Sequence, residues 1–413
     1  MPSLAVWIAA YGQSPLTVEE AVRIGLQRNP QVAAGRAGVD AALAGYHSIS
    51  ILPPVMLGAT HVQGTSTAPT LNGTNNDTFI DLSETLDMSG QRRYQAAGAH
   101  ATYEATRLQL DETLLSLEQQ IRDAYWSLAA AQAQTRIADV SLQEAKRIYE
   151  LTAKQELAGS APRGDVIRSS IDVANSKQTF IAAKGTEKSA LVAFNTLLDR
   201  NPIEPAALAV DLAANDAAPP LIQVPNREEL ARNALRDRPS LQAATQQSRA
   251  ANFGVRQAES ARLPDLSIDY QRSTTQRIDT LLVAVSLPLL DFGTLNASIR
   301  AAKATRKQAE AQELLTERQV LQQVAQAVSD LENAIEAAAS YKREILDPSV
   351  TLLAMAQLGY QQGATGILPV IDAESTIRNA RVGYINALLA VYKAQDELLA
   401  ATGRPSGPVG GSK

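Results

Sequence analysis

The sequence predicts a mainly α-helical chain that is built from two tandem repeats and carries four short β-strands. Three observations predict this fold class. Gly159–Arg200 aligns with Gly363–Arg404 without a gap, at a constant offset of 204 residues. Two very long segments contain almost no helix-breaking residue, and four short segments alternate apolar with polar residues. A repeat of about half the chain indicates one structural unit that is used twice.

Matched residues support the repeat along the whole chain. Within the gapless stretch the pairs are Val166/Val370, Ile167/Ile371, Asn175/Asn379, Lys177/Arg381, Phe180/Tyr384, Ile181/Ile385, Ala183/Ala387 and Arg200/Arg404. Thr17–Leu26 matches Asn226–Leu235 at an offset of 209 residues, and Gln119–Ile121 matches Gln322–Val324 at an offset of 203. We therefore expect repeat 1 over residues 16–200, a linker over residues 201–225, repeat 2 over residues 226–404 and a flexible tail over residues 405–413. Residues 1–15 precede the repeats and contain a short apolar stretch without a basic residue before it, which indicates either a signal-peptide remnant or a wrongly assigned start.

Each repeat is expected to begin with a medium helix and to contain a very long one. Thr17 and Asn226 are each followed by a Glu three residues later, which predicts capping boxes for helices over Thr17–Ser50 and Asn226–Arg262. Between Gln91 and Leu157 only Gly98 interrupts a pattern in which apolar residues recur every three or four positions. Thr294–Gln361 repeats this pattern in the second half. At 1.5 Å per residue, each of these long helices would extend for about 100 Å.

A tight turn after each long helix predicts helical hairpins over residues 91–199 and 293–402. The turns are expected at Ala158–Arg163 and Gln362–Leu368, where glycine supplies a positive φ. The medium helices are about half as long as the long ones, so two of them end to end would match one long helix. Any cross-section of a repeat then contains two helices, and the chain contributes four.

Four strands are expected, at about 53–63, 78–87, 264–271 and 280–289. In the third, Leu266, Ile268 and Tyr270 alternate with polar residues. Loops are expected at Gly64–Asp77 and Arg272–Asp279, where the offset between the repeats changes. These runs have about the length of a transmembrane β-strand, although a small soluble hairpin fits the same residues. Because four strands between such long helices cannot bury a core or close a barrel, we expect further strands from other copies of the chain.

Composition excludes several classes of function. The net charge is −5 without runs of like charge, which argues against a nucleic-acid-binding surface. No apolar stretch of transmembrane-helix length occurs, and cysteine is absent. His47, His61 and His100 have no acidic residue or second histidine at ligand spacing, so no metal site is expected. The sequence offers no catalytic constellation and no cofactor motif, and we expect no enzyme.

Several segments resemble the TolC-type outer-membrane efflux proteins, the outer membrane factors. The C-terminal repeat carries Gly363-Ala-Thr-Gly-Ile-Leu-Pro-Val-Ile-Asp372, followed by Asn379-Ala-Arg and Tyr384. The opening Leu16–Pro30 and the segment Pro288–Gly293 are also similar to this family. The segment Glu84–Arg93 is more similar to the heavy-metal, CzcC-like branch than to the multidrug branch. The resemblance covers Leu16–Gly403, nearly the whole chain.

The resemblance implies a homotrimer in the outer membrane that extends into the periplasm. Its long α-helical hairpins would form a periplasmic α-barrel, and four strands per chain would contribute to a twelve-stranded transmembrane β-barrel. Residues 201–225 would form the equatorial belt between the repeats. The family implies an exit duct of a tripartite efflux pump in heavy-metal or drug resistance. Its partners would be a periplasmic adaptor (membrane fusion) protein and an inner-membrane transporter of RND type.

The same resemblance implies a gate close to the hairpin turns. Asp372 matches an acidic ring residue of the family, and Asp165 and Tyr360 match a pair that hydrogen-bonds across neighbouring hairpins. A ring of carboxylates would favour cations. For Asp165, capping of its helix is an equally good interpretation. The turn residues Gly159, Ser160, Gly363 and Ala364 are expected to contact the adaptor, although both glycines could serve the turn alone.

Two departures from the family concern the gate. Pro369 stands where the family often has a second ring aspartate, and Thr365 stands where it can have a gate arginine. The sequence therefore does not determine which hydrogen bonds hold the gate closed. It also does not identify the transported substrate. The alternative class is a soluble coiled-coil scaffold or a periplasmic adaptor protein, but no lipoyl-like or flanking β-barrel segment is visible.

Overall fold

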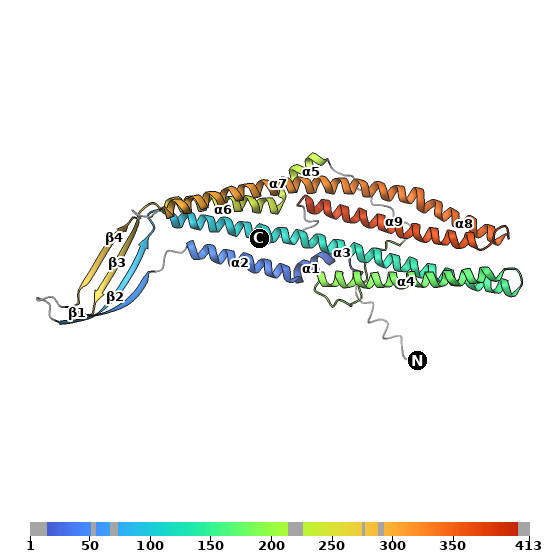
Figure 1. Ribbon diagram of the computed structural model, residues 1–413, viewed down its shortest axis with the longest axis horizontal. Helices are drawn as coiled ribbons and strands as arrows, with labels where there is room; N and C mark the ends of the chain where they lie inside the picture. Colours follow the sequence, from blue (N-terminus) through green and yellow to red (C-terminus); the bar gives the residue numbers. More distant parts are fainter. Residues whose placement is uncertain are drawn as a thin grey trace. The chain divides into compact units, whose positions relative to one another are not determined.

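A computed structural model describes residues 15–50, 55–66, 73–213, 226–274, 277–287 and 293–403. It is mainly helical and contains four antiparallel strands, which confirms this part of the predicted fold class (Figure 1). The chain divides into two compact units. Unit 1 comprises Met1–Ala34, Glu112–Arg238 and Gln319–Lys413, and unit 2 comprises Gly35–Asp111 and Pro239–Arg318. The predicted Pro288–Gly293 motif lies largely outside the described residues.

Unit 1 contains the two helical hairpins. Its helices, some of which continue into unit 2, are α1 (Val18–Arg28), α3 (Gln91–Leu157), α4 (Arg163–Leu197), α5 (Arg227–Asp237), α7 (Thr294–Tyr341), the π-helix η1 (Lys342–Leu346), α8 (Asp347–Gln361) and α9 (Leu368–Ala401). Thr17 and Glu20 form the capping box that the sequence predicts for α1. Asn226 caps α5 through its side chain, which accepts from the amide of Glu228. Both predicted N-cap residues therefore begin helices in the structure.

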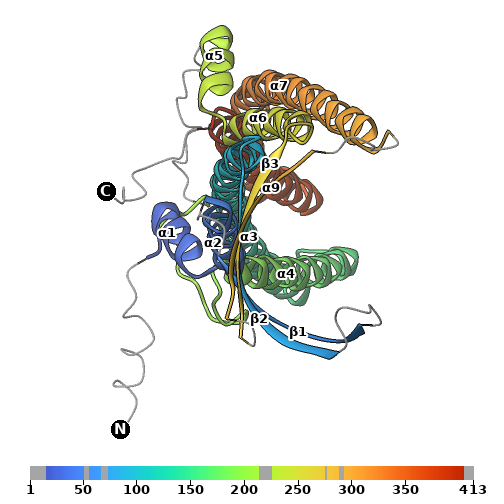
Figure 2. The ribbon, with the colours of Figure 1, turned by 90° about the vertical axis from the view of Figure 1, so that its left-hand side faces the viewer.

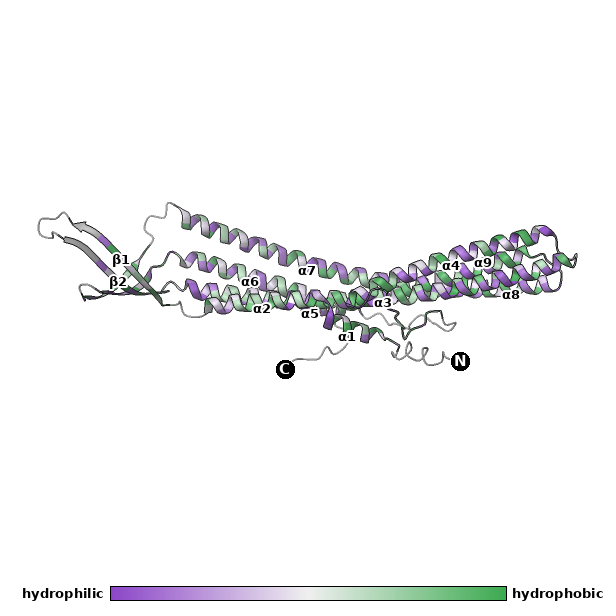
Figure 3. Cartoon of the chain, turned by 90° about the horizontal axis from the view of Figure 1, so that it is seen from below, coloured by the Kyte–Doolittle hydropathy of each residue, from purple (hydrophilic) through white to green (hydrophobic). Residues whose placement is uncertain are grey.

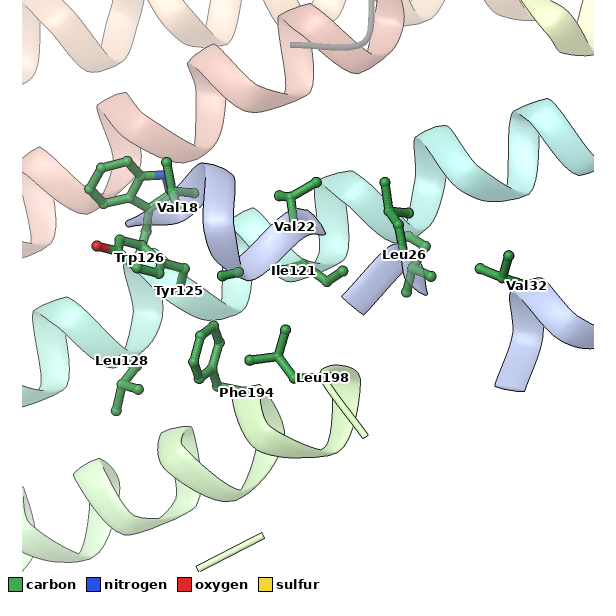
Figure 4. Packing of buried hydrophobic residues seen from close by; sticks show 12 residues of the cluster. Val18, Val22, Leu26, Val32, Ile121, Tyr125, Trp126, Leu128, Phe194 and Leu198 are labelled. Atoms are coloured by element: carbon green, nitrogen blue, oxygen red, sulfur yellow. The ribbon is translucent and has the colours of Figure 1, made fainter. Parts of the chain in front are cut away.

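The core of unit 1 lies on α3, which packs between α4 and α9. Ile121, Tyr125 and Leu128 of α3 are fully buried and pack with Phe194 of α4 and with Leu198, the C-cap residue of α4 (Figure 4). A second cluster joins alanines of α3 to α9 and to the linker; its buried members are Ala129, Ala130, Ala133, Leu212 and Ile385. Figure 2 shows the same order of helices, with α3 between α4 and α9. The small side chains allow close packing on more than one face of α3.

The long helices are amphipathic rather than uniformly apolar. α3 has 67 residues, and Figure 3 shows hydrophilic and hydrophobic residues interspersed along it. Within the described ranges, no helix combines the length and the apolar character that are needed to cross a membrane.

Unit 2 contains the sheet and the remaining helical segments. The sheet has the order β1 (Met56–Ser66), β2 (Gly73–Leu86), β3 (Asp265–Ser273) and β4 (Asp279–Ser286), with every neighbouring pair antiparallel. Its helices are most of α2 (Pro30–Ser50), α6 (Pro239–Ser260) and the first parts of α3 and α7. Register aligns Leu57 with Leu82, Leu82 with Tyr270 and Tyr270 with Leu281, so these four side chains share one face.

Three expected elements differ from the structure. The expected loop at Gly64–Asp77 is partly strand, because the backbone pairing continues to Ser66 and Gly73 and does not require alternating apolar side chains. The expected medium helices break at Asn29 and Arg238, which adopt extended ψ values of 128° and 118° before a proline. The second long helix is not continuous but contains the π-helix η1.

Candidate functional site

The first hairpin turn is a glycine C-cap at the end of α3. Gly159 has φ +72°, and its amide donates to the carbonyl of Glu156 over 2.9 Å. The amide of Ser160 donates to the carbonyl of Gln155, also over 2.9 Å. This pair of bonds is the Schellman motif, which satisfies the last carbonyls of a helix. A Cβ at Gly159 would meet no atom within 4 Å, so only the backbone conformation requires glycine there.

The second hairpin turn repeats this geometry 204 residues later. Gly363 has φ +70° and donates to the carbonyl of Tyr360 over 3.0 Å. The amide of Ala364 donates to the carbonyl of Gly359 over 2.9 Å. All four predicted turn residues are exposed. The turns themselves are confirmed, while contact with an adaptor stays a prediction.

Asp165 is the third residue of α4 and does not cap it. The N-cap position belongs to Pro162, and no side chain accepts a capping hydrogen bond there. Asp165 is half-buried, and its amide donates to the carbonyl of Pro162 over 3.0 Å. A carboxylate in the first turn is still favoured by the helix dipole. The side-chain capping interpretation is therefore wrong for this residue, and its role at a gate stays a prediction.

Tyr360 connects the two hairpins through a residue that the sequence did not single out. Its hydroxyl donates to Oε1 of Gln155, which lies two residues before the end of α3. The ring packs beside a buried cluster of Ile148, Ile367 and Val370. Gln155 thus accepts two kinds of hydrogen bond: its side chain accepts from the hydroxyl of Tyr360, and its backbone carbonyl accepts from the amide of Ser160 in the first turn. In the repeat alignment Gln155 stands opposite Gly359. This mismatch between the two repeats is the sequence signal that could have identified Gln155.

Asp372 is exposed on α9 and lies in the second turn of this helix rather than the first. The nearby Glu374 is half-buried; burial, and then repulsion from Glu144, raise the pKa of its carboxyl. Along the described chain, no hydrogen bond or ion pair joins any two of Asp165, Tyr360 and Asp372.

A buried charge network lies further along the hairpins. Asp396 of α9 accepts a hydrogen bond of 2.8 Å from Nε1 of Trp126 and lies 3.6 Å from Nη1 of Arg122. Arg122 also contacts Glu118 over 3.2 Å, and all three charged side chains are less than one tenth exposed. Trp126 stacks on Tyr392 with 4.0 Å between the ring centroids. Burial raises the pKa of Asp396 to about 6. No sequence pattern indicates this network, because Asp396 is 270 residues away from Trp126 along the chain.

No group of three or more histidine, cysteine or acidic side chains that could hold a metal ion occurs among the residues that the structure describes. The rings of His47 and His100 lie against Tyr46. Nδ1 of His61 lies 2.9 Å from the hydroxyl of Thr78 on the neighbouring strand. The three histidines therefore have local contacts in the fold.

Comparison with known proteins identifies the family. Residues 22–199 and 230–404 both match the model of the outer membrane efflux protein family. The chain belongs to this family. An outer membrane efflux protein is a transport channel rather than an enzyme, and this one acts in efflux at the outer membrane.

Curated relatives and solved structures agree with this membership. The chain is 23% identical over 398 residues to the cobalt-zinc-cadmium resistance protein CzcC of Cupriavidus metallidurans, covering 94% of this chain and 90% of CzcC. It is 24% identical to the pyoverdine export outer membrane protein OpmQ of Pseudomonas putida, over 78% of this chain and 70% of OpmQ. The fold matches the outer-membrane channel OprN with a TM-score of 0.82 at 24% identity, covering 94% of this chain and 90% of OprN. It also matches CusC with a TM-score of 0.81 at 18% identity, covering 94% and 92%.

Proposed function

We propose that this outer membrane efflux protein forms a homotrimeric exit duct of a tripartite pump. It would receive substrates from a periplasmic adaptor and an inner-membrane transporter of RND type. Relatives of the chain include a toluene efflux pump outer membrane protein of Pseudomonas putida and a cation efflux system protein of Escherichia coli. Because these names cover different substrates, the proposal leaves the substrate of this chain open.

The observation that carries the proposal is the reversed polarity of the sheet. On one face the apolar side chains of Leu57, Leu82, Tyr270 and Leu281 are 73%, 43%, 37% and 68% exposed. On the opposite face the polar side chains of Asp81, Ser83, Ser267 and Asp269 are half-buried. A water-soluble sheet would shelter its apolar face instead. An apolar outer face and a polar inner face are typical of a membrane β-barrel and argue against a soluble scaffold.

The unpaired edges of the sheet support assembly from several copies. Strands β1 and β4 each pair on one side only among the described residues. In a membrane every backbone group needs a partner, and the smallest natural barrels of this type have about eight strands. Three copies would supply twelve strands if β4 of one copy paired with β1 of the next. The same three copies would place six hairpins side by side as a periplasmic α-barrel.

The repeats and the gate complete the proposal. Residues 16–200 and 226–404 would be equivalent repeats, joined by the linker over residues 201–225. The gate would comprise Asp372 as an exposed carboxylate ring, with Tyr360 and Asp165 at the contacts between hairpins. The bond from Tyr360 to Gln155 would hold the two hairpins of one chain together. The turns at Gly159, Ser160, Gly363 and Ala364 would contact the adaptor.

Fractionation of cells tests this function. We expect the protein in outer-membrane fractions, migrating on a denaturing gel as a trimer before heating and as a monomer afterwards. A protein that is soluble and monomeric without detergent would contradict the proposal. Leu281→Lys on the apolar face should reduce membrane assembly. As a control, the reverse change at an exposed position of α7, Lys307→Leu, should have little effect.

A further inference from the structure

A groove lies on one face of α3, between α2 and α6, in unit 2. Figure 1 shows α3 between these two helices. The volume of the groove is about 560 Å³, within the range of sites that bind small molecules. Every residue that lines it belongs to unit 2, whereas the hairpin turns and the residues of the proposed gate belong to unit 1. The groove is therefore a different feature from the gate.

Small side chains of α3 form the floor of the groove. Ala96, Ala97 and Ala101 line it, and their side chains end at Cβ. α6 lies close to α3 at this level: a Cβ at Gly98 would lie 3.6 Å from Cβ of Phe253. Since an alanine methyl neither donates nor accepts hydrogen bonds, the floor is suited to the apolar part of a ligand.

Aromatic rings line the groove from both neighbouring helices. Tyr46 of α2 lies edge-on to His100 of α3, with 5.1 Å between the ring centroids. Phe253 lines the groove from α6. Tyr46 and Phe253 are half-buried, so each presents part of its ring to the groove. Aromatic rings attract other rings in edge-to-face or offset-stacked arrangements, which favours a planar aromatic ligand over an aliphatic one.

The groove also contains an arginine that has no partner among the described residues. Arg249 of α6 is exposed and forms no hydrogen bond or ion pair with them. Glu104, the acidic residue that lines the groove, is ion-paired with Arg107 over 3.2 Å. A guanidinium presents its donors as a fork that matches both oxygens of a carboxylate. The charge of the groove is therefore complementary to an anionic ligand.

The arginine and the phenylalanine of α6 lie within reach of one ligand. Gln246, Arg249 and Phe253 follow one another at spacings of three and four residues, so they share one face of α6. Arg249 and Phe253 are separated by about 6 Å along the helix axis. A carboxylate that is attached to one or two fused rings spans this distance. Gln246 supplies an amide beside Arg249 that can donate to the same carboxylate.

We propose that this groove is a binding site for small aromatic carboxylic acids. The ring of the ligand packs on the alanine floor between Tyr46 and Phe253, and its carboxylate accepts hydrogen bonds from the guanidinium of Arg249. The site goes beyond export through the duct, because it assigns a ligand class to a part of unit 2 that includes neither the gate nor the hairpin turns.

Equilibrium dialysis of the purified protein tests the site with 1-naphthoate and its uncharged counterpart, 1-naphthamide. The same detergent is present on both sides of the dialysis membrane, so that partitioning of the probes into detergent cancels. The unchanged protein should bind 1-naphthoate about tenfold more tightly than 1-naphthamide, because only the acid forms the charge-assisted hydrogen bonds to Arg249. Equal affinity for the two probes would overturn the proposal, and this comparison depends on no substitution.

Three variants locate the binding to the groove. Arg249→Gln removes the charge but keeps a donor, so it should weaken 1-naphthoate about tenfold and leave 1-naphthamide unchanged. Arg256→Gln alters an exposed arginine of α6 that does not line the groove, and it should bind both probes as the unchanged protein does. Tyr46→Leu keeps an apolar side chain without the aromatic ring and should weaken both probes. An unchanged preference for the acid in Arg249→Gln, or the same loss in Arg256→Gln, would overturn the proposal.

Discussion

Asp396 should titrate about two pH units above an ordinary aspartate. Burial raises its pKa to about 6 from the ordinary value of 3.8, against the lowering effects of Arg122 and of the hydrogen bond from Trp126. The carboxylates of Asp123 and Glu118 act in the same direction as burial, and the pKa of about 6 includes their effect. A difference of this size corresponds to about 3 kcal/mol between the two protonation states.

The direction of the pH dependence follows from this shift. Because the folded chain holds the proton of Asp396 more tightly than the unfolded chain does, folding binds a proton between pH 3.8 and about 6. The contribution of this group to stability is therefore fully present below that window and is lost as the pH rises through it. Asp396→Asn keeps an oxygen that can accept from Trp126 but removes the charge. Above pH 6 it should raise the free energy of unfolding by at most about 3 kcal/mol.

Trp126 provides the assay. The chain contains two tryptophans, Trp7 and Trp126, so Trp7→Phe leaves one fluorophore, hydrogen-bonded to Asp396. A fluorescence titration should show a midpoint near pH 6, and Asp396→Asn should abolish it. Asp139→Asn, on α3 but outside the network, should leave the midpoint unchanged. A midpoint close to 3.8, or an identical titration in Asp396→Asn, would refute the reasoning.

Three further predictions concern the hairpin ends. Gly159→Ala should destabilise the first turn by about 1–2 kcal/mol, because φ is +72° there, whereas Gly185→Ala within α4 should not; hydrogen exchange near the turn measures both, and equal effects would contradict the prediction. Tyr360→Phe should raise the conductance of the trimer by removing the bond to Gln155, and Gln155→Ala should raise it equally. Unequal effects would mean that the two side chains do not act as a pair. Asp372→Ala should reduce the preference for cations in bilayer recordings, and an unchanged reversal potential would argue against a carboxylate ring.

The sequence predicts the long helices, the turns and the strands well because each depends on a local signal. Apolar spacing of three and four residues places Ile121, Tyr125 and Leu128 in the core. Glycines at positions 159 and 363 predict turns because a left-handed backbone excludes most other residues. These signals depend only on neighbours in the chain, so one sequence suffices to read them.

The missed features depend on geometry that a local pattern does not contain. The break at Asn29 could have been read from Pro30, since proline forces the preceding residue out of the helical conformation. The π-helix left a trace in the change of offset from 203 to 204, which indicates one extra residue in the second repeat, but nothing placed that residue within the segment. Gln155 and Asp396 became visible only when their partners 205 and 270 residues away were in place.

The orientation of the duct is the central claim, and cysteine labelling tests it most directly. The chain has no cysteine, so Thr274→Cys and Ser160→Cys each introduce a single thiol at an exposed position. A large, membrane-impermeant maleimide should label Thr274→Cys in intact cells, because the end of β3 would face the outside in the proposed duct. Ser160→Cys should react only after the outer membrane is permeabilised, because its turn would lie in the periplasm. Labelling of Ser160→Cys in intact cells, or protection of Thr274→Cys, would contradict the account.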